Sequence, residues 1–183
     1  MDECDKRLTF VGTYGDVEFY KYSPSLLKPY YTDYPQESHP DYEKHTAHKI
    51  RMLLEYIFGG YSVYYMFSDG EVAGHIVIAN GGRRLTVSTK EDVVLGPIFI
   101  LPDMRGRGFG TLGIKTLLND LGLEYRYAYE FIAEGNIASI RTAEKNGYEF
   151  VCKAKEVGPM KKLVECSDGN YRVYRYERKH TGR

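Results

Sequence analysis

The sequence predicts a mixed α/β domain in which strands come first and then alternate with helices. Three observations support this prediction. Aromatic and β-branched runs flank Asp69-Gly70, a dipeptide typical of tight hairpins. A strongly apolar run then enters a glycine-rich loop that leads into apolar residues at helical spacing. Finally, a helix-like segment between Asn136 and Gly147 precedes two strand-like runs near the C-terminus.

Length and charge limit the classes of partner. A chain of 183 residues fits a single domain, residues 1–183. Lysine plus arginine and aspartate plus glutamate both number 25, so no net field favours nucleic acid or an anionic membrane surface. Cys4, Cys152 and Cys166 lack metal-site spacing, and no apolar run approaches the length of a membrane span. We expect a cytoplasmic protein that binds no metal, nucleic acid or membrane.

The first third of the chain contains an irregular segment and a helix. Ser23–His45 holds four prolines, and irregular segments of this length usually border functional sites. Apolar residues then recur at helical spacing over Ile50–Ile57, and Gly59-Gly60 is expected to close that helix. We expect residues 23–60 to form a variable flap on the substrate side.

Several strand-like runs follow this flap. SVYYMF and EVAGHIVIA form the expected hairpin around Asp69-Gly70. RLTVST, Arg84–Thr89, and VVLGPIFIL, Val93–Leu101, are predicted to be a second strand pair. Gly96-Pro97 is expected to interrupt the latter, because proline cannot donate to a strand ladder. YRYAYEFIA, Tyr125–Ala133, predicts a further strand.

Two helices are predicted in the second half of the chain. Apolar spacing over Ile114–Leu121 predicts a helix that Gly122 ends. Asn136 is a suitable N-cap for a helix over Ile137–Asn146, which Gly147 terminates. YEFVCKAKEV and NYRVYRYERK then predict two closing strands joined by a long loop.

The loop PDMRGRGFGTLG, Pro102–Gly113, contains four glycines and two arginines. A glycine-rich turn between a strand and a helix directs unpaired backbone N–H groups and the positive end of the helix toward one point, which attracts phosphate. Glycines also let the backbone approach a ligand closely. The loop therefore predicts a phosphate-binding site.

A dinucleotide-binding fingerprint is an alternative interpretation of the same loop. Gly108, Gly110 and Gly113 spell G-x-G-x-x-G, and Glu130 lies near the offset of the ribose-binding acid. However, Pro102–Arg107 separate the strand from the first glycine, and the preceding region supplies hairpins rather than βα units. Glu130 also falls inside its strand rather than at the carboxyl end. The context therefore disfavours a dinucleotide fold.

Two blocks of the sequence resemble one known family. Ile100–Thr111, ILPDMRGRGFGT, looks like the acetyl-CoA-binding motif V-x-P-x-x-R/Q-G-x-G-x-G/A of the GNAT N-acetyltransferase superfamily. Asn136–Tyr148, NIASIRTAEKNGY, resembles that family's N-x-x-S/A…G-F/Y signature. The resemblance covers about residues 61–178. It implies an α/β (α+β) fold with a mixed, mostly antiparallel central sheet of about six to seven strands and helices on both faces.

The resemblance also implies acetyl-CoA as a co-substrate and no metal. Amides of the loop would cradle the pyrophosphate, the preceding strand would pair with pantetheine, and the capping asparagine would contact the CoA arm. The implied cofactor-binding residues are Phe99, Ile100, Arg105, Gly106, Arg107, Gly108, Phe109, Gly110, Thr111, Asn136 and Ser139. The acceptor amine would attack the thioester carbonyl directly, in a ternary complex.

The acid and base of the reaction are less evident. The family often has a tyrosine, as the acid for the thiolate, where this chain has Ala143. That departure resembles the branch containing the ribosomal-protein N-terminal acetyltransferases. Another tyrosine or water would then protonate the thiolate. Glu130, an acid inside a buried strand, is the candidate base, and a structural ion pair or a side chain that faces a sheet edge is the alternative.

The acceptor is predicted to be a primary amine of a small metabolite, bound partly by Tyr31 and Tyr34 of the flap. A protein N-terminus is the second candidate acceptor. A CoA-binding module without catalysis remains an alternative, because Ala143 replaces the usual tyrosine and the strand before the loop lacks an acid. A homodimer is also compatible with the sequence, and the histidines do not decide among these hypotheses.

Overall fold

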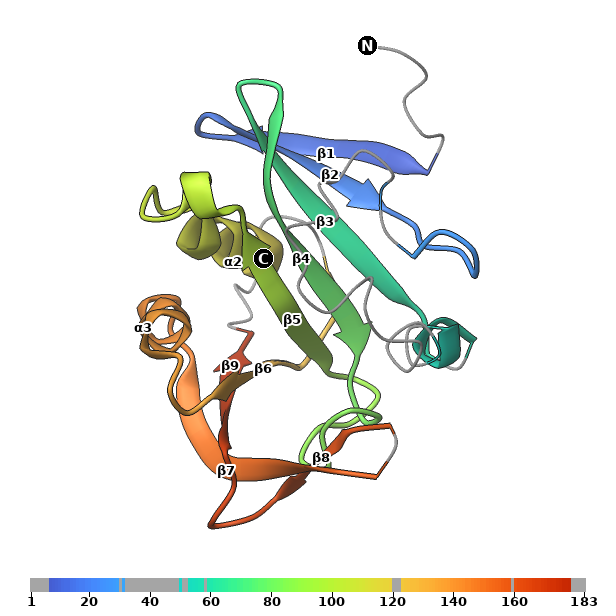
Figure 1. Ribbon diagram of the computed structural model, residues 1–183, viewed down its shortest axis with the longest axis vertical. Helices are drawn as coiled ribbons and strands as arrows, with labels where there is room; N and C mark the ends of the chain where they lie inside the picture. The colour runs from blue at the N-terminus through green and yellow to red at the C-terminus, as the bar shows by residue number, and fades with distance from the viewer. Residues whose placement is uncertain are drawn as a thin grey trace, which may run out of the picture. The chain divides into compact units, whose positions relative to one another are not determined.

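The computed structural model describes residues 7–29, 31, 50, 53–57, 59–119, 123–158 and 160–178. Its named elements are β1 (Leu8–Tyr14), β2 (Val17–Tyr22), β3 (Tyr61–Ser68), β4 (Glu71–Asn80), β5 (Val93–Ile100), η2 (Pro102–Met104), α2 (Phe109–Asn119), β6 (Tyr127–Ala133), α3 (Ile137–Lys145), β7 (Glu149–Val157), β8 (Lys162–Glu165) and β9 (Tyr171–Glu177) (Figure 1).

The strands are hydrogen-bonded in the order β1-β2-β3-β4-β5-β6-β9-β7-β8. β5 and β6 run parallel, whereas β1–β2, β2–β3, β6–β9, β7–β9 and β7–β8 are antiparallel. The predicted mixed and mostly antiparallel sheet is therefore confirmed, with nine strands in the described part of the chain instead of six to seven. Internal contacts group the chain into two compact units, Met1–Ile78 with Pro97–Gly110 and Ala79–Gly96 with Thr111–Arg183.

The first two strands, β1 and β2, were not predicted from the sequence. β1 and β2 form an antiparallel hairpin, and β2 pairs in turn with β3. Tyr20 joins this hairpin to β3, because its ring makes edge contacts with Phe10 at 5.3 Å and with Phe67 at 5.0 Å. Phe10 is 54% exposed, so β1 lacks the clear alternation of buried and exposed residues that reveals a strand in a sequence.

The β3–β4 hairpin confirms the prediction from Asp69-Gly70. Both residues have positive φ, 54° for Asp69 and 79° for Gly70. Two successive positive φ angles define the turn that matches the twist of a two-residue hairpin. Local turn chemistry therefore sets the register of these strands.

The predicted strand over Arg84–Thr89 is wrong. That stretch forms turns, and its one bridge pairs Leu85 with Leu163. Ser88 Oγ donates to Leu85 O at 3.1 Å and accepts from Gly82 N at 2.8 Å. Side-chain hydroxyls that bond nearby backbone groups in this way compete with a strand ladder. β5 itself is confirmed, but it runs through Gly96-Pro97 without the predicted break.

Much of the predicted flap lies outside the described residues. Ile50 and residues 53–57 are helical, as predicted, and the Gly60 amide donates to Glu55 O at 2.9 Å at the end of this helix. Residues 32–49 are outside the described part. No helix in the part that the structure covers has both the length and the apolar character of a membrane span.

In the second unit, β6, β9, β7 and β8 form a continuous antiparallel series. One face of it carries a core cluster of Leu85, Val94, Tyr129, Cys152, Ala154, Leu163 and Val173. α3 contacts β6 (Figure 1). The two predicted closing strands are confirmed as β7 and β9. β8 follows β7 in the chain and pairs with it at the edge of the sheet. It was missed because it is short and has charged ends.

Candidate cofactor site

The candidate site begins where β5 ends. A Cβ at Gly74 of β4 would collide with the carbonyl oxygen of Phe99, so glycine permits the close approach of β4 to β5. Ile100 O instead accepts a hydrogen bond from Arg105 Nε at 3.1 Å. Because backbone groups of successive strand residues point to opposite edges, Ile100 presents its carbonyl away from β4.

The loop backbone then adopts an unusual conformation. After the short turn η2, Gly106 has a φ of 78° and Gly108 a φ of 87°. A Cβ built on either glycine meets no heavy atom within 4 Å, so crowding inside the protein does not explain these glycines. When left-handed and right-handed residues alternate, successive backbone N–H groups point toward the same side. Such a concave set of N–H groups, called a nest, binds anions. The space beside the loop is open.

The amides of this loop are available to a ligand. Within the described part of the chain, the N–H groups of Gly106, Arg107 and Gly108 have no backbone acceptor. α2 begins at Phe109, and the N–H groups of a first helical turn have no partner within the helix. That turn contains no acidic residue. The helix end therefore adds partial positive charge to the nest, which favours an anion.

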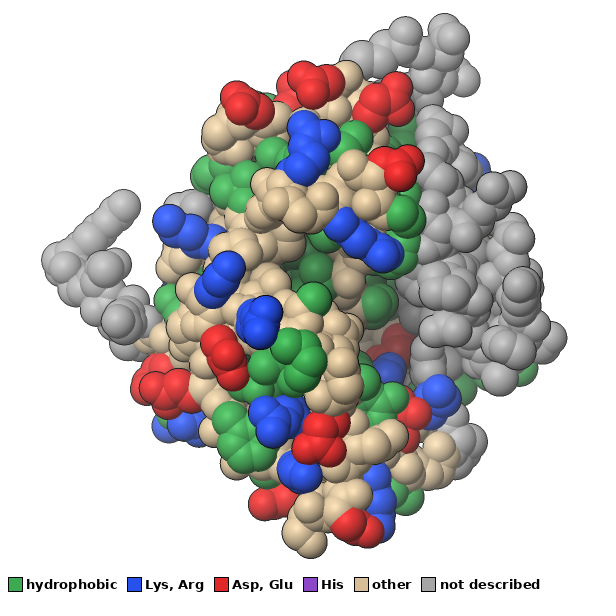
Figure 2. Space-filling model, turned by 60° about the vertical axis from the view of Figure 1, so that its left-hand side comes forward, with side chains coloured by type: hydrophobic (Ala, Val, Ile, Leu, Met, Phe, Trp, Pro, Cys, Tyr) green, Lys and Arg blue, Asp and Glu red, His purple; other side chains and the backbone are tan. Residues whose placement is uncertain are grey.

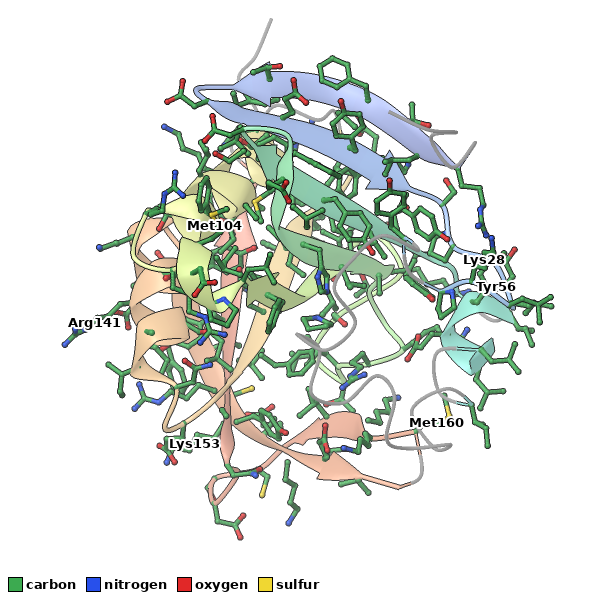
Figure 3. The ribbon with its side chains drawn as sticks, turned by 45° about the horizontal axis from the view of Figure 1, so that its top comes forward. Lys28, Tyr56, Met104, Arg141, Lys153 and Met160 are labelled. Atoms are coloured by element: carbon green, nitrogen blue, oxygen red, sulfur yellow. The ribbon has the colours of Figure 1, made fainter. Side chains whose placement is uncertain are left out.

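The two arginines of the loop are held by neighbouring side chains. The Arg105 guanidinium lies 5.8 Å from the centre of the Phe99 ring. Arg107 lies 5.1 Å from the centre of the Phe109 ring and donates to the sulfur of Met104, in the turn labelled in Figure 3. No ion pair involves either arginine among the described residues. Both positive charges remain available to an anion.

Tyr31 lies at one end of a series of aromatic rings that reaches β5. Its N–H donates to the Tyr65 hydroxyl at 3.0 Å, and the two rings are 5.7 Å apart. The Tyr65 ring lies 5.8 Å from that of His75, which stacks on Phe99 at 6.0 Å. The flap residue is thus connected to the strand that leads into the loop. Tyr34, its predicted companion, lies outside the described residues.

Gly110 closes the loop segment of the first unit, whereas Thr111, Asn136 and Ser139, which were also predicted to bind the cofactor, belong to the second unit. Thr111 lies in the first turn of α2. Asn136 is the N-cap of α3, as predicted, and its Oδ1 accepts from Ser139 N at 3.2 Å. Asn136 is exposed and Ser139 is half-buried. A contact of these two residues with CoA stays a prediction.

Glu130 occupies the middle of β6 and is 3% exposed. Burial raises the pKa of its carboxyl to about 8, and the hydroxyl of Tyr148 opposes this rise in part. The predicted alternative, a structural ion pair, is not found, because none of the described basic residues pairs with Glu130. A protonated carboxyl at neutral pH is the consequence. The role of Glu130 as a base stays a prediction.

Charge and metal ligands add little to the site. No group of three or more metal-ligating side chains occurs in the described ranges. Figure 2 shows acidic and basic side chains interspersed over the face that it presents.

A comparison with family models identifies the family of this chain. A model described as the acetyltransferase (GNAT) family matches residues 24–148, which is more than half of the chain. The chain belongs to the GNAT acetyltransferase family. The expectation from the loop and the α3 motif is confirmed at this level, and the protein is accordingly an acyltransferase.

Solved structures share the GNAT fold at low identity. A RimL ribosomal L7/L12 α-N-protein acetyltransferase in its apo form matches with a TM-score of 0.62, 12% identity, and 97% of this chain and 98% of that chain covered. A RimL structure in complex with coenzyme A matches with a TM-score of 0.58 and 16% identity, and the match covers 92% of this chain and 97% of that chain. An acetyltransferase from Thermus thermophilus gives a TM-score of 0.49 and 18% identity, with 64% of each chain covered. The search of curated proteins returned no match.

The GNAT sheet of this chain contains a buried clamp that sequence reasoning missed. The Asp92 carboxylate is 2% exposed and accepts from Thr89 N at 2.7 Å and from Tyr127 N at 3.1 Å. It thereby ties the start of β5 to the start of β6. The parallel register of these strands comprises Val93↔Ala128 and Val94↔Tyr129. Nothing in the local sequence distinguishes Asp92 from a surface acid.

Proposed function

We propose that this GNAT protein transfers the acetyl group of acetyl-CoA to the primary amine of a small metabolite. The observation that carries the proposal is the loop after β5. Gly106 and Gly108 hold left-handed backbone beside open space, and three loop amides have no backbone acceptor among the described residues. A diphosphate supplies the acceptor oxygens that such amides need.

Each part of the loop has a separate role in this proposal. The amides from Arg105 to Thr111 donate to the diphosphate oxygens, and the α2 N-terminus adds partial positive charge. Arg105 and Arg107 supply charge-assisted hydrogen bonds to the same group. A Cβ at Gly106 or Gly108 would occupy the open space and force a strained φ on the new residue. The glycines therefore serve the ligand.

The reaction needs little covalent help from the protein. The amine attacks the thioester carbonyl, the C–N bond forms, and the C–S bond breaks to leave a thiolate. The protein orients the two substrates, and a backbone N–H of β5 near Phe99 or Ile100 stabilises the developing oxyanion. The outward backbone of Ile100 supports a pairing with the pantetheine arm as well.

The small-metabolite acceptor is supported by the position of Tyr31. This residue is buried, and its ring begins the series of ring contacts that ends at Phe99. The flap therefore contributes a tyrosine to the aromatic cluster beside β5. Tyrosine offers both an apolar ring and a polar tip to a small amine. We place Tyr31 in the acceptor-binding wall.

A protein N-terminus is the second candidate acceptor. Two observations favour it. The RimL structures, whose titles name an α-N-protein acetyltransferase, match 92–97% of this chain. The α3 segment also has Ala143, a departure that resembles the ribosomal-protein branch of the family. At 12–16% identity, these structures support a shared fold and leave the acceptor to experiment.

Turnover on defined acceptors tests the proposal. Purified protein is mixed with acetyl-CoA and with two acceptor sets, small primary amines and short peptides with a free N-terminus, while free thiol is measured. We expect thiol release with at least one small amine. Release with peptides alone would support the protein acceptor, and binding of acetyl-CoA without turnover on either set would support a non-catalytic module.

Calorimetric titration separates the proposal from the dinucleotide interpretation. We expect acetyl-CoA to bind and NAD not to bind. The opposite preference would overturn the proposed cofactor. Light scattering on the same preparation tests the possible homodimer.

A further inference from the structure

Met104 lies in the short turn η2, directly before the glycines of the cofactor loop (Figure 3). None of the three residues of η2, all of which the structure describes, is buried. Met104 itself is half-buried, so its side chain is accessible to small solutes. Packing of a core therefore does not explain a methionine at this position.

The sulfur of Met104 accepts a hydrogen bond from a loop arginine. Arg107 Nη1 lies 3.0 Å from Met104 Sδ, and the Arg107 guanidinium lies 5.1 Å from the centre of the Phe109 ring. Arg107 is exposed, and a thioether sulfur is a weak acceptor. Arg107 can therefore leave Met104 at little cost and turn toward an anion in the loop.

The other arginine of the loop is held differently. Arg105 Nε donates to the backbone carbonyl of Ile100 at 3.1 Å, and its guanidinium lies 5.8 Å from the centre of the Phe99 ring. A backbone carbonyl is a full-strength acceptor, whereas a thioether is not. The two arginines therefore differ in how readily they reorient, and the atom that holds Arg107 is one whose chemistry can change.

Oxidation of methionine changes the strength of this acceptor. Hydrogen peroxide transfers one oxygen atom to the thioether sulfur: a sulfur lone pair forms the S–O bond, the O–O bond breaks, and water leaves. The sulfur is oxidised and the peroxide is reduced, so no other co-reactant is needed. The sulfoxide oxygen carries partial negative charge. It therefore accepts hydrogen bonds from a guanidinium much more strongly than the thioether does.

The contacts that matter here belong to one compact unit. The segment Pro97–Gly110 contains Met104 and Arg107 together with the two glycines of the nest, Gly106 and Gly108. A change at the Met104 sulfur therefore reaches the nest through a single side chain, that of Arg107.

We propose that Met104 is a site of reversible oxidation by peroxide, and that its sulfoxide weakens CoA binding by holding Arg107 away from the diphosphate. The proposal rests on the proposed cofactor role of the loop. In the reduced protein, Arg107 donates charge-assisted hydrogen bonds to the diphosphate oxygens. In the oxidised protein, the sulfoxide oxygen competes for the same N–H groups. The loop amides still bind the diphosphate, so the affinity falls without being abolished.

The test is calorimetric titration of acetyl-CoA into reduced protein and into protein treated with dilute hydrogen peroxide. Dithiothreitol follows the peroxide, because it returns cysteine sulfenic acids and disulfides to thiols and leaves methionine sulfoxide unchanged. Peptide mass spectrometry measures the sulfoxide at each methionine. We expect sulfoxide at Met104 and a fall in affinity of roughly tenfold, the scale of one hydrogen bond to a charged group. Unchanged affinity with Met104 fully oxidised would overturn the proposal.

Met104→Leu and Met160→Leu are matched variants, because leucine has a similar volume and cannot be oxidised in this way. Met160 is also half-buried in a turn, but it precedes β8 in the other unit (Figure 3). We expect Met104→Leu to keep the affinity of the reduced wild type after peroxide, and Met160→Leu to lose affinity as the wild type does. Both variants retain all three cysteines. A loss of affinity in peroxide-treated Met104→Leu would therefore assign the effect to another residue and overturn the proposal.

Two further variants test the role of Arg107. Glutamine has an unbranched side chain with a carbonyl oxygen, which is a strong acceptor, so Met104→Gln should weaken acetyl-CoA binding without peroxide. Equal affinities of Met104→Gln and Met104→Leu would contradict the proposed competition for Arg107. In Arg107→Ala, which starts from a lower affinity, peroxide should cause no further loss. A further loss as large as that of the wild type would mean that the sulfoxide acts on another group, and would overturn the proposal.

Failure of this inference differs from failure of the proposed function. If the reduced wild type does not bind acetyl-CoA, the cofactor role of the loop is wrong and the inference falls with it. If the reduced protein binds and the Met104 sulfoxide leaves the affinity unchanged, the cofactor role stands and the oxidation site is wrong. Methionine sulfoxide reductase, which returns the sulfoxide to the thioether, should restore the affinity of the oxidised wild type. An affinity that stays low after complete reduction of Met104 would also contradict the proposal.

Discussion

At the scale of single residues, Gly108 is the most informative position of the loop. It has a φ of 87° and open space where a Cβ would lie. We predict that Gly108→Asp weakens acetyl-CoA binding by about tenfold or more, because a carboxylate would enter an anion nest in a strained conformation. Calorimetric titration with acetyl-CoA measures the change.

Gly158→Asp is the matched control for that substitution. Gly158 also has a positive φ, 71°, and no heavy atom within 4 Å of a built Cβ, but it lies in the turn after β7. The substitution Gly158→Asp therefore introduces the same charge and similar backbone strain outside the loop. We expect its affinity for acetyl-CoA to match the wild type. An equal loss in both variants would indicate a general effect of the charge or of instability.

Glu130 also makes a prediction about stability that needs no substrate. Its pKa rises from 4.5 to about 8 on folding, so its contribution to stability is complete below pH 4.5 and is lost as the pH rises through 8. Relative to Glu130→Gln, the wild type should lose up to about 1.4 kcal/mol of unfolding free energy per pH unit in that window. Urea unfolding at pH 5 and pH 8 measures this.

Glu134→Gln is the control for the pH effect. Glu134 is exposed, and Lys153 at 2.9 Å lowers the pKa of its carboxyl. Its stabilising contribution is therefore present above the ordinary carboxyl pKa and is lost in acid, the opposite direction to that of Glu130. Parallel stability curves for wild type and Glu130→Gln at both pH values would mean that Glu130 ionises freely in the folded protein.

At the scale of elements, the start of α3 depends on its cap. Asn136 Oδ1 accepts from Ser139 N, which satisfies one of the unpaired amides of the first turn. We predict that Asn136→Ala lowers the unfolding free energy by about 1 kcal/mol, and that Asn136→Ser, which keeps a capping oxygen, lowers it by much less. Denaturant unfolding measures both. Equal losses would mean that the cap does not stabilise the helix.

Asn136→Ser also isolates the predicted contact with CoA. The serine preserves the cap and removes the side-chain amide, so a stable variant with weaker acetyl-CoA binding would support the contact. An unchanged affinity would assign Asn136 to the helix alone.

The clamp at the start of β5 and β6 gives another prediction at this scale. The Asp92 carboxylate accepts hydrogen bonds from Thr89 N, Thr89 Oγ1 and Tyr127 N. An asparagine side chain would place its NH2 group against at least one of these donors, so that hydrogen bond would be lost. We predict that Asp92→Asn lowers the unfolding free energy by about 1–3 kcal/mol. Asp103→Asn, which changes an exposed acid of η2, should have little effect. Similar effects of the two would contradict the clamp.

At the scale of the whole molecule, the elements that the sequence predicts are those with local signals. Asp69-Gly70 specifies its hairpin through two positive φ angles, and Asn136 and Gly147 bracket α3. The loop from Pro102 is recognisable because its glycines and arginines are adjacent in the sequence. Each signal depends on neighbouring residues, so no long-range contact is needed to read it.

The features that were missed depend on residues distant in the sequence. Arg84–Thr89 has strand-like composition, but hydrogen bonds of Ser88 and Asp92 hold the stretch in turns, and it meets β8 only through the bridge of Leu85 with Leu163. β8 exists because it pairs with β7, and Tyr148 becomes notable because folding buries it beside Glu130. Neither the composition nor the spacing of residues along the chain reveals these contacts between distant residues.

The central claim is that the loop after β5 binds the diphosphate of CoA. Backbone amide hydrogen exchange, followed by NMR over the whole chain with and without CoA, tests it most directly. We predict that CoA slows exchange of the amides from Gly106 to Thr111, whose N–H groups would then be hydrogen-bonded. Unchanged exchange of these amides in the presence of saturating CoA would contradict the account.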